Sequence, residues 1–100
     1  MNLPTKGFYY HYKHDPAGPL GNYTYEVIGV GRNTELETLV VLYRPLYINL
    51  WLKPAEYCSR PLEMFLEEVA KGDTTSPRFQ KVTDENVIAE LEALKNTMYP

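Results

Sequence analysis

The sequence predicts a small, mainly β protein: an antiparallel barrel or roll of four or five short strands, followed by a C-terminal α-helix. Three observations lead to this fold class. The chain has 100 residues, the size of one domain. Aromatic residues make up 13% of it, and nine of them are tyrosine, which suits half-buried strand positions. Short aromatic and β-branched runs alternate with turn-rich segments, and the last segment alone has a clear helical period.

Residues 7–14 read GFYYHYKH, an aromatic run without proline that predicts the first strand. Side chains alternate between the two faces of a strand. One face is wholly aromatic and consists of Phe8, Tyr10 and Tyr12. The other face is more polar and consists of Tyr9, His11 and Lys13. We therefore expect the second face to lie toward solvent or a groove.

The middle of the chain predicts three further strands separated by loops. Residues 15–22 contain two prolines and two glycines, which is typical of a loop. The strands are expected at 23–32, 38–44 and 47–53, with a polar turn at 33–37. Gly29 and Gly31 inside the second strand predict a bulge or bend, as small barrels need in order to close.

The segment from residue 60 onward is more polar. A helical turn is expected at 60–65, with proline near its start. Residues 66–70 fit either a last short strand or a continuation of that turn. A hydrophilic loop is expected at 71–77, and a brief edge strand at 78–82.

Residues 83–98 give the clearest helix, with Thr83 or Asp84 as its N-cap. Apolar residues recur on one face at Val87, Leu91, Leu94 and Met98, with Ile88 beside them. A single helix of this length is marginal in water, so the stripe must dock on another surface. We therefore divide the chain into a β domain at 1–81 and a helix at 82–100 that packs on it or on a partner.

Composition argues against several classes of protein. The net charge of −3 at pH 7 weakens a nucleic-acid role, which needs a basic face. The single cysteine, Cys58, permits no intramolecular disulfide. The first residues lack the apolar core of a signal peptide. The most apolar stretch, 39–52, is interrupted by Arg44, Pro45 and Asn49, so we expect no membrane span. The simplest interpretation is a cytoplasmic protein.

Several short motifs occur in an order that resembles a bacterial family known as domain of unknown function 1653. The residues that carry the resemblance span 7–81 and are Tyr9, His11, Tyr12, Lys13, Tyr25, Val27, Arg32, Val40, Val41, Tyr43, Leu46, Tyr47, Leu50, Trp51, Arg60, Pro61, Met64 and Phe65. The resemblance implies that 1–81 is an SH3-like β-barrel, and it implies no established activity. The chain departs from the family pattern where LKPAEYCS separates Trp51 from Arg60.

Small barrels of the SH3 type often bind peptides or nucleic acids through aromatic rims, where a cation over a ring adds attraction. The candidate ligand-binding residues here are Tyr9, His11, Lys13, Arg32, Trp51 and Arg60. We therefore predict a non-catalytic binding module for a peptide, a protein or a nucleic-acid strand. The alternative is that Arg60 pairs with a carboxylate and the rings pack in the core.

The sequence offers little for catalysis, metals or cofactors. His11 and His14 lie three positions apart, which places them on opposite faces of a strand, and no cysteine cluster supports a metal site. The stretch GVGRNT lacks the third glycine of a dinucleotide site, so no cofactor is expected. Two further hypotheses stay open. One is a structural protein that forms a homodimer through its helix, and the other is a small enzyme that uses His11 and Cys58.

Overall fold

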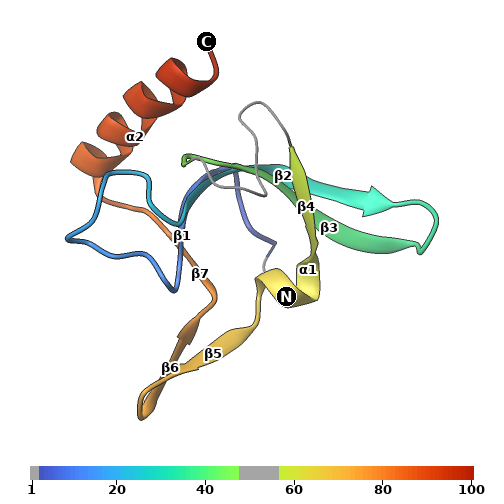
Figure 1. Ribbon diagram of the computed structural model, residues 1–100. Helices are drawn as coiled ribbons and strands as arrows, with labels where there is room; N and C mark the ends of the chain where they lie inside the picture. The colour runs from blue at the N-terminus through green and yellow to red at the C-terminus, as the bar shows by residue number, and fades with distance from the viewer. Residues whose placement is uncertain (1–2, 48–56) are drawn as a thin grey trace.

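Antiparallel strands form most of the protein, which is described here from a computed structural model for residues 3–47 and 57–100 (Figure 1). The elements in chain order are β1 (Gly7–His11), β2 (Thr24–Asn33), β3 (Thr38–Pro45), β4 (Cys58–Pro61), α1 (Leu62–Phe65), β5 (Glu68–Lys71), β6 (Thr74–Pro77), β7 (Phe79–Lys81) and α2 (Glu85–Met98). Five of these strands form one sheet in the order β4-β3-β2-β1-β7, and β5 pairs with β6 in a separate hairpin. The predicted class, mainly β with a C-terminal helix, is confirmed.

The strand β2 is the longest and organises the sheet. Its first half pairs with β1, with Tyr9 opposite Tyr25, and its whole length pairs with β3. The register shifts between Val27 and Gly29, so the irregularity expected at the strand glycines is present. Beyond Val27 the strand pairs with β3 alone among the described residues, and the β2–β3 hairpin extends past the rest of the sheet (Figure 1).

The predicted closure into a barrel is not found in the described part of the chain, where β4 and β7 form the two edges of the sheet. The segment between α1 and β7 folds back on itself as the β5–β6 hairpin, so its backbone hydrogen bonds are satisfied within the hairpin. The two edges nevertheless come close through side chains. The guanidinium of Arg60, on β4, lies 5.3 Å from the ring centre of Phe79, on β7.

Some expected elements differ from those observed. The loop predicted at 71–77 contains β6, which pairs with Glu68–Lys71 across a turn in which Gly72 has a φ of +66°. Threonine favours strands, but this hairpin is largely exposed and therefore has no apolar alternation. Arg60 and Pro61, expected at the start of a helical turn, belong instead to β4, together with Cys58 and Ser59. The edge strand expected at 78–82 is present as β7, and most of the strand expected at 47–53 falls outside the described residues.

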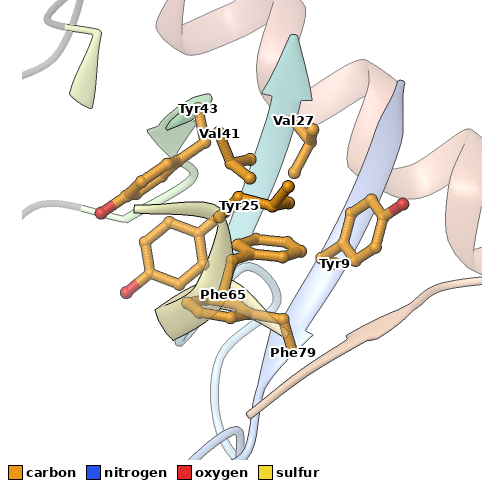
Figure 2. Close-up of a cluster of buried hydrophobic side chains, with 8 residues drawn as sticks. Tyr9, Tyr25, Val27, Val41, Tyr43, Phe65 and Phe79 are labelled. Carbon is orange, nitrogen blue, oxygen red and sulfur yellow. The ribbon is translucent and has the colours of Figure 1, made fainter. Parts of the chain in front are cut away.

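The main core lies on one face of the sheet and is rich in tyrosine and phenylalanine (Figure 2). Its buried members are Tyr9, Tyr25, Val27, Val41, Tyr43, Leu62, Phe65 and Phe79. A second cluster covers the opposite face and consists of Phe8, Leu46, Val82 and Leu91, with further residues of α2 packed against it. Because β1 has a hydrophobic cluster on each side, neither of its faces is open to solvent at Phe8 and Tyr9.

The burial of Tyr9 corrects the expectation that it belongs to an accessible face. Tyr9 is only 6% exposed, and its ring contacts Phe65 edge-on at 5.5 Å. Its hydroxyl donates a hydrogen bond to the carbonyl of Thr5 and accepts one from the Thr5 amide. The alternation of faces holds, but at Tyr9 the face that looked polar in sequence is covered by α1 through Phe65, whereas His11 is half-buried and Lys13 is exposed.

The helix α2 starts where the sequence indicates and packs on the sheet of its own chain. Asp84 is the N-cap, because its side chain accepts hydrogen bonds from the amides of Asn86 and Val87. Leu91 is fully buried in the second cluster, and the remaining residues of the apolar stripe pack around it. This packing occupies the surface that the homodimer hypothesis assigned to a second copy. No helix in the described ranges has the length and apolar character needed to cross a bilayer.

Candidate functional site

His11 ends β1 and lies inside a group of aromatic rings. Its amide donates a hydrogen bond to the Tyr23 carbonyl, which fixes the end of the strand beside β2. Four rings surround the imidazole, with centres at 4.5 to 6.5 Å, and they belong to Tyr12, Tyr23, Tyr25 and Phe79. This histidine is therefore held by packing from β1, β2 and β7 rather than free at a rim.

The surroundings of His11 favour its neutral form. The pKa of the imidazole is lowered from 6.5 to about 4, first by burial and then by the positive charges of Arg60, Arg78 and Lys13. The Nδ1 atom accepts a hydrogen bond from the Lys13 amide, at 3.2 Å. The proton of the neutral ring therefore lies on Nε2.

Arg60 is the most unusual residue of this region. It lies on the edge strand β4, opposite Val41, and its guanidinium stacks over Phe79. Its Nε is buried without a hydrogen-bond partner, and within the described ranges no carboxylate pairs with this side chain. Arg78 also has a buried, unpartnered Nε, but its Nη2 contacts Glu67 at 3.1 Å. Within residues 3–47 and 57–100, the charge of Arg60 therefore lacks the carboxylate partner that the alternative interpretation required.

The hydroxyl of Tyr25 lies within the electrostatic influence of Arg60. Tyr25 and Tyr47 share a hydrogen bond of 2.5 Å between their hydroxyl oxygens. Burial raises the pKa of Tyr25, the hydrogen bond to Tyr47 raises it further, and the charge of Arg60 opposes both effects. The ring of Tyr23, which is 39% exposed, stacks on His11 and contacts Tyr47. We call His11, Tyr23, Tyr25, Tyr47, Arg60 and Phe79 the aromatic–arginine cluster.

A small pocket of about 160 Å³ adjoins the cluster between the end of β1 and the strands β6 and β7. It is lined by Tyr10, His11, Tyr12, His14, Ser76, Pro77 and Gln80. The ring of His14 stacks on Tyr10 at 3.9 Å, and its Nδ1 donates a hydrogen bond to the Asn22 carbonyl. The imidazole of His14 is therefore held at the pocket by Tyr10 and by the loop at 15–22.

The structure brings together only part of the candidate set read from the sequence. His11 and Arg60 share the cluster, and Lys13 adjoins it with its Nζ 5.9 Å from the ring centre of Tyr12. Tyr9 belongs to the core. Arg32 lies near the far end of β2, roughly 20 Å from Tyr25 at 3.3 Å per residue, and its Nη1 faces the Glu37 carbonyl. Trp51 lies outside the described residues.

Sequence reasoning missed Tyr23, Tyr25, Tyr47, Phe79 and Arg78 as members or neighbours of this site. The pairing of β1 with β7, which sets His11 opposite Phe79, joins segments far apart in the chain. A short edge strand such as β7 carries no sequence pattern that identifies the strand with which it pairs. The one usable signal was the abundance of tyrosine in two neighbouring strands, which indicated an aromatic surface but not its location.

The described residues do not assemble a metal site or a catalytic pair. No group of three or more histidine, cysteine or carboxylate side chains lies close enough to hold a metal in the ranges 3–47 and 57–100. Cys58 is half-buried and packs against the main core, opposite Tyr43. The hydrogen bonds of the His11 ring do not include Cys58 in this part of the chain, so these two residues do not form a nucleophile and base there.

Comparison with known proteins places the whole β portion of the chain in one family. Residues 7–81 match the family described as "Protein of unknown function (DUF1653)". A crystal structure of a DUF1653 protein from Bordetella bronchiseptica is 31% identical in sequence, with a TM-score of 0.60, and the match covers 81% of this chain and 94% of that one. No curated protein matches the sequence. The fold, the order of the motifs and these two matches agree: the chain belongs to the DUF1653 family.

Proposed function

We propose that this protein is a non-catalytic binding module, and that the aromatic–arginine cluster binds an acidic group of a peptide or protein partner. The observation that carries this proposal is Arg60, a cation stacked on Phe79 with a buried Nε that has no partner within the described ranges. An unsatisfied buried donor costs about 1–3 kcal/mol, so a fold keeps one only where something offsets that cost. A guanidinium with unused donors suits bidentate recognition of a carboxylate.

The local charge supports an acidic ligand. Arg60, Arg78 and Lys13 all act on His11, so the region is positive although the protein carries a net charge of −3. A nucleic-acid strand needs an extended basic face that neutralises several phosphates. Here Arg78 is already paired with Glu67, which leaves a local rather than an extended positive surface. A single carboxylate-bearing segment fits this charge pattern better than a nucleic acid.

The rings around Arg60 give the ligand a surface for its apolar part. Tyr23 is stacked on His11 and contacts Tyr47, yet it remains 39% exposed, so its ring is both supported and accessible. Flat rings bury a large area with little loss of side-chain entropy. The edge strands β4 and β7 meet here through Arg60 and Phe79, and we propose that this contact closes an SH3-like roll with the binding surface at the junction.

The test uses NMR titration of the ¹⁵N-labelled protein with two blocked peptides. Both contain a tyrosine, followed by two glutamates in one peptide and by two glutamines in the other. We expect the glutamate peptide to shift the amides of His11, Tyr23 and Phe79, and the glutamine peptide to bind at least about tenfold more weakly. The variant Arg60→Met, which keeps length and apolar character, should lose this preference.

The variant Arg32→Met is the matched control. It removes a cation that lies about 20 Å from the aromatic–arginine cluster and leaves the residues of the cluster unchanged. It should bind the glutamate peptide like the parent protein. Equal binding of both peptides, or unchanged binding by a folded Arg60→Met variant, would show that the cluster is not an acidic-ligand site. The dispersion of the amide spectrum reports whether each variant is folded.

A further inference from the structure

A second concave surface lies away from the aromatic–arginine cluster, between the β2–β3 hairpin and the junction of β4 with α1. Its volume is about 420 Å³, and it is lined by Leu36, Thr38, Leu39, Pro61, Leu62 and Glu63. We call this surface the hairpin groove. The hairpin that forms one of its walls extends past the rest of the sheet (Figure 1).

The groove has a fixed floor and an exposed apolar rim. Leu62 is 5% exposed and belongs to the main core, and Leu39 packs against the same core. Leu36 is 71% exposed, the largest exposed fraction among the large apolar side chains described. A floor held by the core needs no rearrangement to accept a ligand, which lowers the entropic cost of binding. An apolar side chain placed here would cover Leu36 and Pro61 from water.

The charges near the groove have one predominant sign. Glu63 lines it directly, and Leu36 lies between Glu35 and Glu37 in the turn of the hairpin. Arg32 adjoins this turn, where its Nη1 faces the Glu37 carbonyl. These residues therefore include three carboxylates and one guanidinium. Complementary charge at a rim selects partners and speeds their association, so this rim favours a basic partner.

We propose that the hairpin groove binds a peptide segment of a partner protein in which a leucine-type side chain is flanked by lysine or arginine. The apolar anchor occupies the space between Leu36 and Leu62, and the flanking cations lie beside Glu63 and the acidic turn. The proposal does not rest on the acidic-ligand site. Arg60 and Pro61 are neighbours on β4, and neighbouring residues of a strand face opposite sides.

The experiment is an NMR titration of the full chain with two blocked tetrapeptides. One has two leucines between two lysines, and the other has the same leucines between two glutamates. We expect the lysine peptide to shift the amides of Thr38, Leu39 and Glu63, and to bind more tightly than the glutamate peptide. The variant Leu36→Ser should weaken the lysine peptide by about tenfold, because the anchor loses most of its apolar contact at the rim.

Charge reversal tests the rim separately. Glu63→Lys should lower the affinity for the lysine peptide and raise that for the glutamate peptide. Two variants serve as matched controls: Leu20→Ser removes a leucine that is 47% exposed outside the groove, and Glu90→Lys reverses an exposed charge on α2. Both controls should bind the lysine peptide like the parent protein, since neither residue lines the groove.

Three outcomes would overturn the proposal. The first is the absence of binding by the lysine peptide at millimolar concentration. The second is binding that Leu36→Ser and Glu63→Lys leave unchanged. The third is concentration-dependent self-association in sedimentation that Leu36→Ser abolishes, because the groove would then be occupied by a second copy of the chain.

Discussion

Acidification should destabilise the protein through His11. The pKa of this imidazole is about 4 in the fold, against 6.5 for an unperturbed histidine. Because the folded pKa is the lower one, the unfolded chain binds more protons between these two values. The stabilisation is therefore complete above pH 6.5 and is lost progressively as the pH falls toward 4.

The size of the effect follows from the gap between the two pKa values. At 1.36 kcal/mol per pH unit, the gap corresponds to an upper bound of about 3.4 kcal/mol in the free energy of unfolding. The His11 side chain is half-buried, so solvent screens part of this energy. We expect a loss of about 1–2 kcal/mol between pH 7 and pH 4.5, which is a substantial fraction of the stability of a small domain.

The assay is urea unfolding at several pH values, for the parent protein and for His11→Phe. Phenylalanine keeps a ring among Tyr12, Tyr23 and Phe79 but does not titrate. Carboxylates titrate equally in both proteins, so the difference between the two pH profiles isolates His11. Parallel profiles, or an NMR titration of the His11 ring with a midpoint near 6.5, would refute the argument from burial and neighbouring cations.

Three further predictions concern stability. Phe65→Ala should lower the free energy of unfolding by about 3–5 kcal/mol in urea unfolding, since the ring is 3% exposed in the main core, and a loss below 1 kcal/mol would contradict that position. Asp84→Ala should cost about 1 kcal/mol and lower the thermal midpoint measured by circular dichroism, whereas Asp84→Asn, which can still cap, should cost less. Gly21→Ala should destabilise strongly, because Gly21 has a φ of +89° and a Cβ there would lie 2.5 Å from the Leu46 carbonyl oxygen. Gly29→Ala, where a Cβ meets nothing within 4 Å, is its control, and equal melting temperatures for these two variants would count against the close contact.

Much of the fold could be predicted from local sequence. Aromatic and β-branched runs between turn signals located β1, β2 and β3, and the helical period together with Asp84 located α2. A short strand at 66–70 was one of the two alternatives and is present as β5, but β6 escaped prediction because it is largely exposed and shows no apolar alternation. Local sequence also could not decide whether the sheet closes into a barrel. Closure depends on which short strands become its edges, here β4 and β7.

The candidate site was predictable only in part, for a related reason. Alternation along β1 correctly separated Tyr9 from Phe8, but it could not reveal that both faces are covered. The contact of Arg60 with Phe79 joins two edge strands that are remote from β1 in sequence. Sequence patterns report which residues share a face of one strand, whereas a site built from three strands depends on their arrangement in space.

The position of β1 between β2 and β7 has a consequence for folding during synthesis. This strand is synthesised well before one of its two neighbours, β7, which is formed by Phe79–Lys81. A nascent chain that still lacks those residues leaves one side of β1 without its hydrogen-bond partners and Phe8 without Val82 above it. Stable folding of this sheet therefore waits until β7 and Val82 have left the ribosome, and pairing between such distant segments slows folding.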